Sequence, residues 1–122
     1  MAKILLVEDD EDISDNAALF LEHKGHQVTI MDNGTDGLEQ MRYGNFDIII
    51  LDGHLPDIDG LELCRSYREE GGKIPVLMAT GRSSSADQQR GQDVGVNGYI
   101  IKPYSLEDLV AKIDSILASV PG

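Results

Sequence analysis

Short runs of apolar residues alternate along the chain with longer segments in which apolar residues recur every three or four positions. Uninterrupted apolar runs are typical of strands buried on both faces of a parallel sheet, and the wider spacing is typical of amphipathic helices. The pattern therefore predicts strands and helices in alternation. The five predicted strands are Lys3–Val7, Gln27–Met31, Phe46–Leu51, Pro75–Ala79 and Tyr99–Ile101.

Five helices are predicted after these strands, and glycines or capping residues mark most of their ends. Ser105 is the expected N-cap of the last helix, whose apolar stripe continues to Val120. Ser84 and Asp87 resemble a capping box for the fourth helix. That helix has few apolar residues and an interior Gly91, so we expect it to be the least stable. The helices are expected within segments 13–24, 38–44, 60–71, 84–95 and 105–120.

This alternation predicts one α/β domain that spans residues 1–122. Right-handed crossovers would place the five strands in one parallel sheet flanked by the five helices. For a sheet of this size we expect the flavodoxin-like order 2-1-3-4-5, with its switch point between strands 1 and 3. Ligands of such sheets bind at the carboxyl ends of the strands, so the residues that follow the strands are the candidate functional residues.

Composition and charge restrict the classes of partner. A net charge of −12 argues against binding of a nucleic-acid backbone or an anionic membrane by this domain alone. No apolar run is long enough to span a membrane, and the first strand begins at Lys3 with no signal peptide before it. The single Cys64 excludes an internal disulfide and favours a reducing compartment, so we expect a cytoplasmic protein.

A polar residue follows each of the five predicted strands. Because parallel strands end at the same edge of a sheet, these residues are expected to converge there. Asp32 follows the outer second strand and is expected to be a turn residue. The converging residues are Glu8, Asp9 and Asp10 after the first strand, Asp52 after the third, Thr80 after the fourth and Lys102 after the fifth.

Several carboxylates in one crevice repel one another unless a cation lies among them. Oxygen ligands without a His or Cys cluster favour a hard cation, Mg²⁺ or Mn²⁺. Lys102 can pair with Asp52 or with an incoming anion, and the Thr80 hydroxyl can donate a hydrogen bond. Each residue alone is more common as a turn, cap or surface residue, but together they predict phosphoryl transfer with Asp52 as the nucleophile.

The three histidines are not expected to take part through their side chains. His23 and His26 have no partner cluster and are predicted to be surface residues. His54 lies in a loop, where histidine side chains are commonly solvated.

The segments ILLVEDD, LDGHLPDIDG, MATG and GYIIKPY together resemble the receiver domain of response regulators in two-component signalling. The resemblance covers nearly the whole chain. It implies that Asp52 accepts a phosphoryl group from a phosphohistidine of a sensor histidine kinase or a histidine phosphotransfer protein. It also implies an Mg²⁺ site, replaceable by Mn²⁺, in which Asp9 and Asp52 are ligands and Glu8 acts mainly through water. The backbone carbonyl of His54 would be a further ligand.

The same resemblance implies how the signal is passed on. Thr80 and Lys102 would hold the phosphoryl oxygens, and the side-chain rotamer of Tyr99 would follow activation. The face formed by the fourth helix, fifth strand and fifth helix would then act on a downstream effector protein or domain. The first helix, near Ile13 and Ala17, would contact the kinase. The resemblance also implies a cis Lys102-Pro103 bond, and a signalling domain that catalyses only its own phosphoryl transfer and dephosphorylation.

Two other classes share parts of this pattern. A haloacid-dehalogenase-like phosphohydrolase also uses an aspartate at a strand end with Mg²⁺, but it needs a second aspartate where this chain has His54. A flavodoxin-like flavin carrier needs a phosphate-binding loop after the first strand, where this chain has the acidic segment EDDED. The chain departs from the usual receiver pattern at Gly53-His54 and at Tyr104, and none of these changes removes an essential group.

Overall fold

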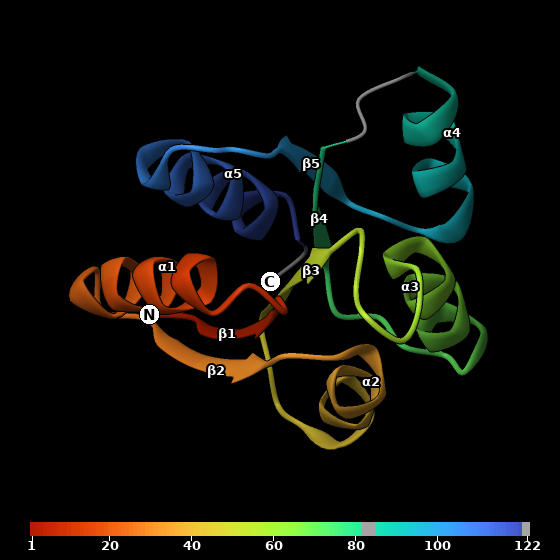
Figure 1. The fold of residues 1–122 in the computed structure, drawn as a ribbon, viewed down its shortest axis with the longest axis horizontal. Helices are drawn as coiled ribbons and strands as arrows, with labels where there is room; N and C mark the ends of the chain where they lie inside the picture. The colour runs from red at the N-terminus through yellow and green to blue at the C-terminus, as the bar shows by residue number, and fades with distance from the viewer. Residues whose placement is uncertain (82–84, 121–122) are drawn as a thin grey trace.

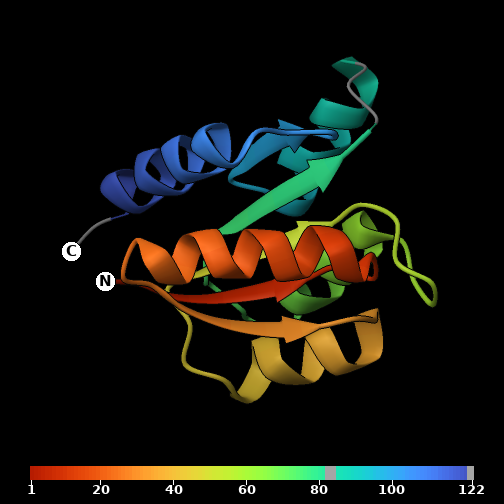
Figure 2. The same ribbon diagram turned by 60° about the vertical axis from the view of Figure 1, so that its left-hand side comes forward.

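The computed structural model describes residues 1–81 and 85–120. Its strands are parallel and form one sheet in the order β2-β1-β3-β4-β5, which confirms the predicted topology. The strands point the same way, and the N-terminus lies at the opposite end of the molecule from the strands' carboxyl ends (Figure 2). The strands are β1 (Lys3–Val7), β2 (Gln27–Met31), β3 (Ile48–Asp52), β4 (Val76–Thr80) and β5 (Gly98–Ile101).

Helices cover both faces of the sheet and give three layers. One face is covered by α1 and α5, and the other by α2, α3 and α4 (Figure 1). None of the helices in the described ranges is long and apolar enough to cross a membrane. The helices are α1 (Glu11–His23), α2 (Gly34–Tyr43), α3 (Gly60–Glu69), α4 (Ser85–Val94) and α5 (Leu106–Ser119).

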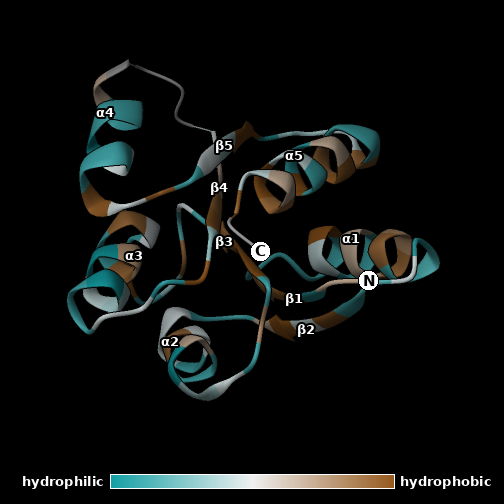
Figure 3. Ribbon diagram, turned by 180° about the vertical axis from the view of Figure 1, so that it is seen from behind, coloured by the Kyte–Doolittle hydropathy of each residue, from teal (hydrophilic) through white to brown (hydrophobic). Residues whose placement is uncertain are grey.

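The core is aliphatic and lies on both sides of the central strands. Successive residues of a strand point to opposite faces, so Ile48 packs in the cluster beside α1 and α5, and Ile49 packs in the cluster beside α2 and α3. Both side chains are fully buried, and each such burial is worth about 1.5–3 kcal/mol. The hydropathy colours show apolar strands between helices whose outer faces are polar (Figure 3).

Three strands have boundaries that differ from the prediction, and two of these differences are small: β4 begins at Val76 rather than Pro75, and β5 begins at Gly98 rather than Tyr99. β3 begins at Ile48 rather than Phe46, and it includes Asp52, which pairs with Ala79 in the parallel ladder. β4 likewise extends to Thr80. The hydrogen bonds of the ladder continue through these polar residues, so the two candidate site residues are held by the sheet itself.

The helices α3, α4 and α5 lie within the predicted segments, whereas α1 begins two residues and α2 four residues before the predicted ones. Ser105 caps α5, because its hydroxyl accepts a hydrogen bond from the N–H of Asp108 at 3.1 Å. The stripe of α5 is one residue shorter than predicted, since the helix ends at Ser119 and Val120 is 40% exposed. Ser84 of the expected capping box lies outside the described residues.

His26 corrects the prediction that it is a surface residue. It is half-buried, and its Nδ1 accepts a hydrogen bond from the N–H of Ala2 at 3.0 Å. His23 is exposed, as predicted.

Candidate functional site

Three carboxylates meet at the carboxyl edge of the sheet. Oxygen atoms of Glu8, Asp9 and Asp52 all lie within 4.8 Å of one another. Strands β1 and β3 are neighbours with Val7 paired to Leu51, so Glu8 and Asp52 are placed side by side. Both are buried, at 3% and 4% exposure, whereas Asp9 is exposed.

Asp10 does not join this cluster, although its position in the sequence suggested that it would. It is the N-cap of α1, and its carboxylate accepts a hydrogen bond from the N–H of Ile13 at 3.1 Å. Its own N–H donates to Glu8 Oε2 at 3.2 Å. Asp10 therefore starts the helix and helps to orient Glu8.

Lys102 brings one positive charge to the three carboxylates. Its Nζ lies 2.6 Å from Glu8 Oε1 and 3.3 Å from Asp52 Oδ1. The lysine backbone is held next to the end of β4, because its N–H donates to the carbonyl of Thr80 at 2.9 Å. The Lys102-Pro103 bond is cis, which confirms the expectation from the resemblance.

The crevice holds more negative charge than Lys102 can balance. The pKa of Glu8 is raised to about 7, chiefly because burial disfavours the charged form and Asp52 adds a like charge, against the ion pair with Lys102. Burial tends to lower the pKa of Lys102, but Glu8 and Asp52 outweigh it, so that pKa lies above its ordinary value. Clustered carboxylate oxygens with excess negative charge fit a hard divalent cation.

The loop from Gly53 to Asp59 follows Asp52 directly. The N–H of His54 donates to Asp52 Oδ1 at 3.1 Å, while the His54 side chain is exposed. The base of the loop is closed by a hydrogen bond from the N–H of Gly60 to the carbonyl of Gly53 at 3.0 Å and by a bridge between His54 and Asp59. The backbone of His54 is thereby kept next to the carboxylate cluster.

Thr80 is buried at the end of β4, beside the loop that follows Asp52. A Cβ placed on Gly53 would lie 3.0 Å from Thr80 Oγ1, so the glycine leaves space next to this hydroxyl. Thr80 therefore lies at the same sheet edge as Asp52 and Lys102, as the sequence predicted.

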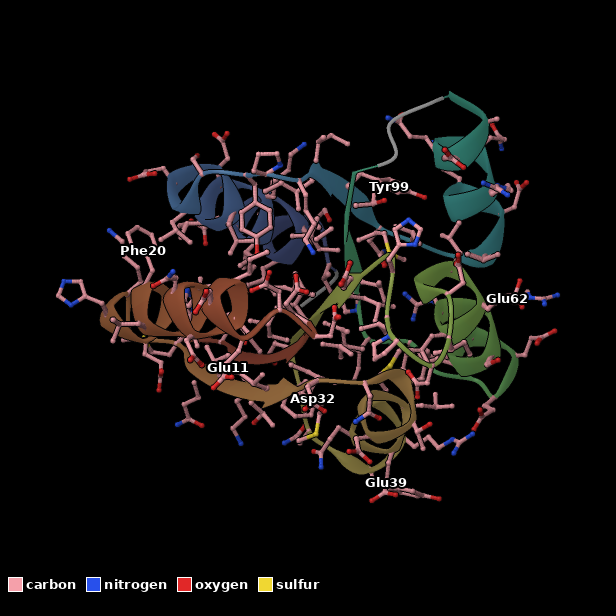
Figure 4. The ribbon with its side chains drawn as sticks, in the orientation of Figure 1. Glu11, Phe20, Asp32, Glu39, Glu62 and Tyr99 are labelled. Carbon is pink, nitrogen blue, oxygen red and sulfur yellow. The ribbon has the colours of Figure 1, made fainter. Side chains whose placement is uncertain are left out.

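Tyr99 lies on β5 and reaches α4 rather than the carboxylates (Figure 4). Its hydroxyl donates to the carbonyl of Asp87 at 3.1 Å, and its ring occupies the space that the absent side chain of Gly91 leaves on α4. Tyr99 therefore connects β5 with α4.

Two residues of this region had no predicted role. Asp57 forms hydrogen bonds with the first turn of α2, a contact that no motif in the sequence indicated. Tyr104 is half-buried near the crevice, and its pKa is raised by burial and then by the charge of Glu8. Its position two residues after Lys102 was noted only as a departure from the family pattern.

A groove of about 670 Å³ lies between α1 and α5. Phe20 projects from α1 toward α5 in this region (Figure 4). Leu19 is 71% exposed. Ala17, which was expected near a partner contact, is fully buried in the core, so its side chain is not available to a partner. The groove is lined by Ile13, Asn16, Leu19, Phe20, His23, Tyr104 and Leu106.

Comparison with known families identifies the domain. The family described as "Response regulator receiver domain" matches residues 4–114. The chain belongs to this family. Receiver domains are signalling modules of two-component systems rather than conventional enzymes, so family membership sets aside the phosphohydrolase and flavin-carrier alternatives.

This receiver domain resembles known response regulators in both sequence and fold. The response regulator ArlR of Staphylococcus saprophyticus is 39% identical over 121 residues, which are 99% of this chain and 54% of ArlR. The chain spans about half the length of the curated relatives it matches. The solved structure of the Vibrio cholerae chemotaxis protein CheY4 superposes with a TM-score of 0.89 at 30% identity and covers 95% of this chain and 98% of CheY4.

A third relative was solved with a metal ion. It is the receiver domain of the sensor histidine kinase PA1611 from Pseudomonas aeruginosa, with magnesium coordinated in its active site cleft. It matches with a TM-score of 0.85 at 27% identity and covers 97% of this chain and 98% of that receiver domain. The receiver domain described here has an acidic cluster at the carboxyl edge of the same fold.

Proposed function

We propose that Asp52 accepts a phosphoryl group from a phosphohistidine of a sensor histidine kinase or a histidine phosphotransfer protein. A carboxylate oxygen of Asp52 attacks phosphorus, the phosphorus–nitrogen bond breaks, and its electron pair stays with the imidazole of the donor. The observation that carries this proposal is the buried Asp52 at a strand end, within 3.3 Å of Lys102 and inside the carboxylate cluster.

Asp9, Asp52, Glu8 and the backbone carbonyl of His54 would hold Mg²⁺, with Glu8 acting mainly through water. The excess of carboxylate oxygens in the crevice supports this assignment, as does the magnesium ion in the PA1611 receiver domain. Bound Mg²⁺, or Mn²⁺ in its place, supplies positive charge for the phosphoryl oxygens. Lys102 and Thr80 hold the oxygens of the transferred group through a charge and a hydroxyl.

Phosphorylation would shift the domain between two states. Thr80 moves toward the phosphoryl group on Asp52, and the rearranged end of β4 changes the position of Tyr99, which contacts α4 in this structure. The altered surface of α4, β5 and α5 then acts on an effector protein or domain. Relatives described as transcriptional regulatory proteins, one from Bacillus subtilis and one from Picosynechococcus, support an effector of this kind.

The kinase or phosphotransfer partner would dock on the groove between α1 and α5. Ile13 lines this groove and Leu19 extends from it, so a partner helix could bury apolar side chains there. The residues 1–122 would act as one receiver domain in the cytoplasm, where the buried free thiol of Cys64 stays reduced. Direct contact of this acidic domain with nucleic acid or an anionic membrane is not part of the proposal.

The test is intact mass after incubation with Mg²⁺ and acetyl phosphate or a phosphorylated kinase. We expect one added phosphoryl group on the unmodified protein, and none on Asp52→Ala or after chelation of the metal. Exposed Asp12 provides the matched control, because Asp12→Ala removes the same charge from the first turn of α1. A protein that stays unmodified with both donors would contradict the proposal.

A further inference from the structure

The carboxylate of Asp57 joins the loop after the phosphoacceptor to the start of α2. Its Oδ1 accepts a hydrogen bond from the N–H of Gly34 at 2.7 Å. Its Oδ2 accepts one from the N–H of Thr35 at 2.9 Å and one from the Thr35 hydroxyl at 2.8 Å. These partners lie 22 and 23 residues away in the sequence, so the contact is tertiary. We call these three hydrogen bonds the Asp57 clamp.

The clamp completes the first turn of α2. Asn33 is the local N-cap, and its side chain accepts a hydrogen bond from the N–H of Asp36 at 2.8 Å. Asp57 accepts from the two preceding N–H groups, which have no partner within the helix. These bonds, led by the one from Gly34, hold the pKa of Asp57 below its ordinary value. The carboxylate is therefore charged at neutral pH, and the helix dipole favours that charge.

The clamp fixes the outer part of a loop whose base is fixed separately. At the base, the N–H of Gly60 donates a hydrogen bond to the carbonyl of Gly53, and His54 forms a backbone bridge with Asp59. The outer part reaches α2 through Asp57 and through Ile58, whose side chain occupies the space a Cβ on Gly34 would need. The path of the backbone around His54 is thus determined from both sides.

We propose that Asp57 is a positioning residue, which holds the His54 carbonyl where it can bind Mg²⁺ by anchoring their common loop to α2. This inference rests on the proposed Mg²⁺-dependent phosphorylation of Asp52. Asp57 does not touch the phosphoryl group or the metal, because its oxygens are engaged by α2. Without the clamp the loop samples more conformations, and binding the ion must then order them again.

The first experiment compares Mg²⁺ affinities by isothermal titration calorimetry at fixed ionic strength. Asp57→Ala is expected to weaken Mg²⁺ binding about tenfold, the low end of the effect of outer partners in metal sites. Asp57→Asn keeps one acceptor oxygen, so its Mg²⁺ affinity is expected to fall less than that of Asp57→Ala. Asp12→Ala removes an equal charge near the same sheet edge and should change affinity by less than about twofold, because exposed charges are screened.

Kinetics separate positioning from a general loss of structure. For Asp57→Ala we expect the Mg²⁺ concentration that gives half the maximal rate of phosphorylation by acetyl phosphate to rise by the factor lost in affinity. The rate at saturating Mg²⁺ should stay within about twofold of the unmodified protein, since no group at the reacting atoms has changed. A lower rate at saturating Mg²⁺ with an unchanged half-saturation point would overturn the inference.

The second experiment needs no substitution and so does not depend on how a variant folds. Coupling between two sites is reciprocal, so an ion that is bound better when the clamp is closed must also favour the closed clamp. Hydrogen exchange at the amides of Gly34 and Thr35 is therefore expected to slow when Mg²⁺ is added to the unmodified protein. Exchange at these two amides that is the same with and without Mg²⁺ would overturn the inference.

The outcomes distinguish this inference from the function on which it rests. If the unmodified protein binds Mg²⁺ and Asp57→Ala binds it equally well, Asp57 is not a positioning residue and the proposed function stands. If the unmodified protein binds no Mg²⁺, the proposed function is wrong and the inference is wrong with it.

Discussion

Lys102 is paired more closely with Glu8 than with the proposed phosphoacceptor, at 2.6 Å against 3.3 Å. Burying two carboxylates with one lysine is costly, because removal from water is only partly offset by the ion pairs. The shorter contact goes to Glu8, so the Asp52 carboxylate is the less tightly paired of the two. The buried carboxylates therefore lower the stability of the metal-free protein, and they also make the site suitable for a cation.

This cost should be visible as a pH dependence of the metal-free protein. A carboxyl group whose pKa is higher in the folded state takes up protons on folding, so the free energy of unfolding falls as the pH rises. For Glu8 the window runs from its ordinary value of 4.5 to about 7. In the unmodified protein we expect Glu8 to lower the free energy of unfolding by roughly 1–3 kcal/mol as the pH rises through this window. Glu8→Gln should not show this decrease. Urea unfolding at both ends of the pH window, with a chelator present, measures this difference. An equal change in the free energy of unfolding with pH for the two proteins would contradict the prediction.

The residues that converge on the site could be predicted because each one ends or follows a strand. Glu8, Asp52, Thr80 and Lys102 interrupt apolar runs, and parallel strands bring such positions to one edge. Asp57 could not be found in this way. Its partners lie in the first turn of α2, and no local pattern in the sequence indicates a hydrogen bond over more than twenty residues.

The helix α4 packs against β5 at a glycine, where the absence of a side chain leaves space for a tyrosine ring. Gly91 is buried on α4, and a Cβ at this position would overlap the ring of Tyr99. The interior glycine suggested only a weak helix, because the sequence does not show what packs against it. In the structure it provides the space in which the tyrosine of the proposed switch lies.

Gly91→Ala should therefore have the opposite effect from the usual one. In most helices this substitution stabilises by about 1 kcal/mol. Here we expect it to destabilise the protein by about 1–3 kcal/mol, because Tyr99 must leave its place. In a Tyr99→Ala background the same change should stabilise again. Chemical denaturation of the four proteins of this double-mutant cycle measures the coupling, and additive effects would argue against the fit.

The order of the strands in the sheet could be predicted from the sequence, whereas the exact ends of the strands could not. Five apolar runs separated by helical segments leave few right-handed arrangements, and the order 2-1-3-4-5 is the one observed. The end of β3 was placed one residue early, because Asp52 looks like a loop residue in the sequence. It pairs with Ala79 in the ladder, a contact that depends on a neighbouring strand.

If the acidic crevice binds Mg²⁺ as proposed, the ion should stabilise the whole fold. An ion that binds only the folded state at one hundred times its dissociation constant adds about 2.7 kcal/mol to the free energy of unfolding. For a domain of this size that raises the melting temperature by roughly 10 °C. Calorimetric melting with and without Mg²⁺ measures the shift. Asp9→Asn should abolish most of it, and sodium chloride of equal ionic strength should not reproduce it.

Tyr104 lies at the boundary between the carboxylate crevice and the groove of α1 and α5. The chain contains no tryptophan, so its intrinsic emission comes from tyrosine alone. Tyr104→Trp would place a single indole where the charge of the crevice and the occupancy of the groove both change its surroundings. Quenching or a shift of its emission would then report metal binding, phosphorylation and partner docking in real time from one position.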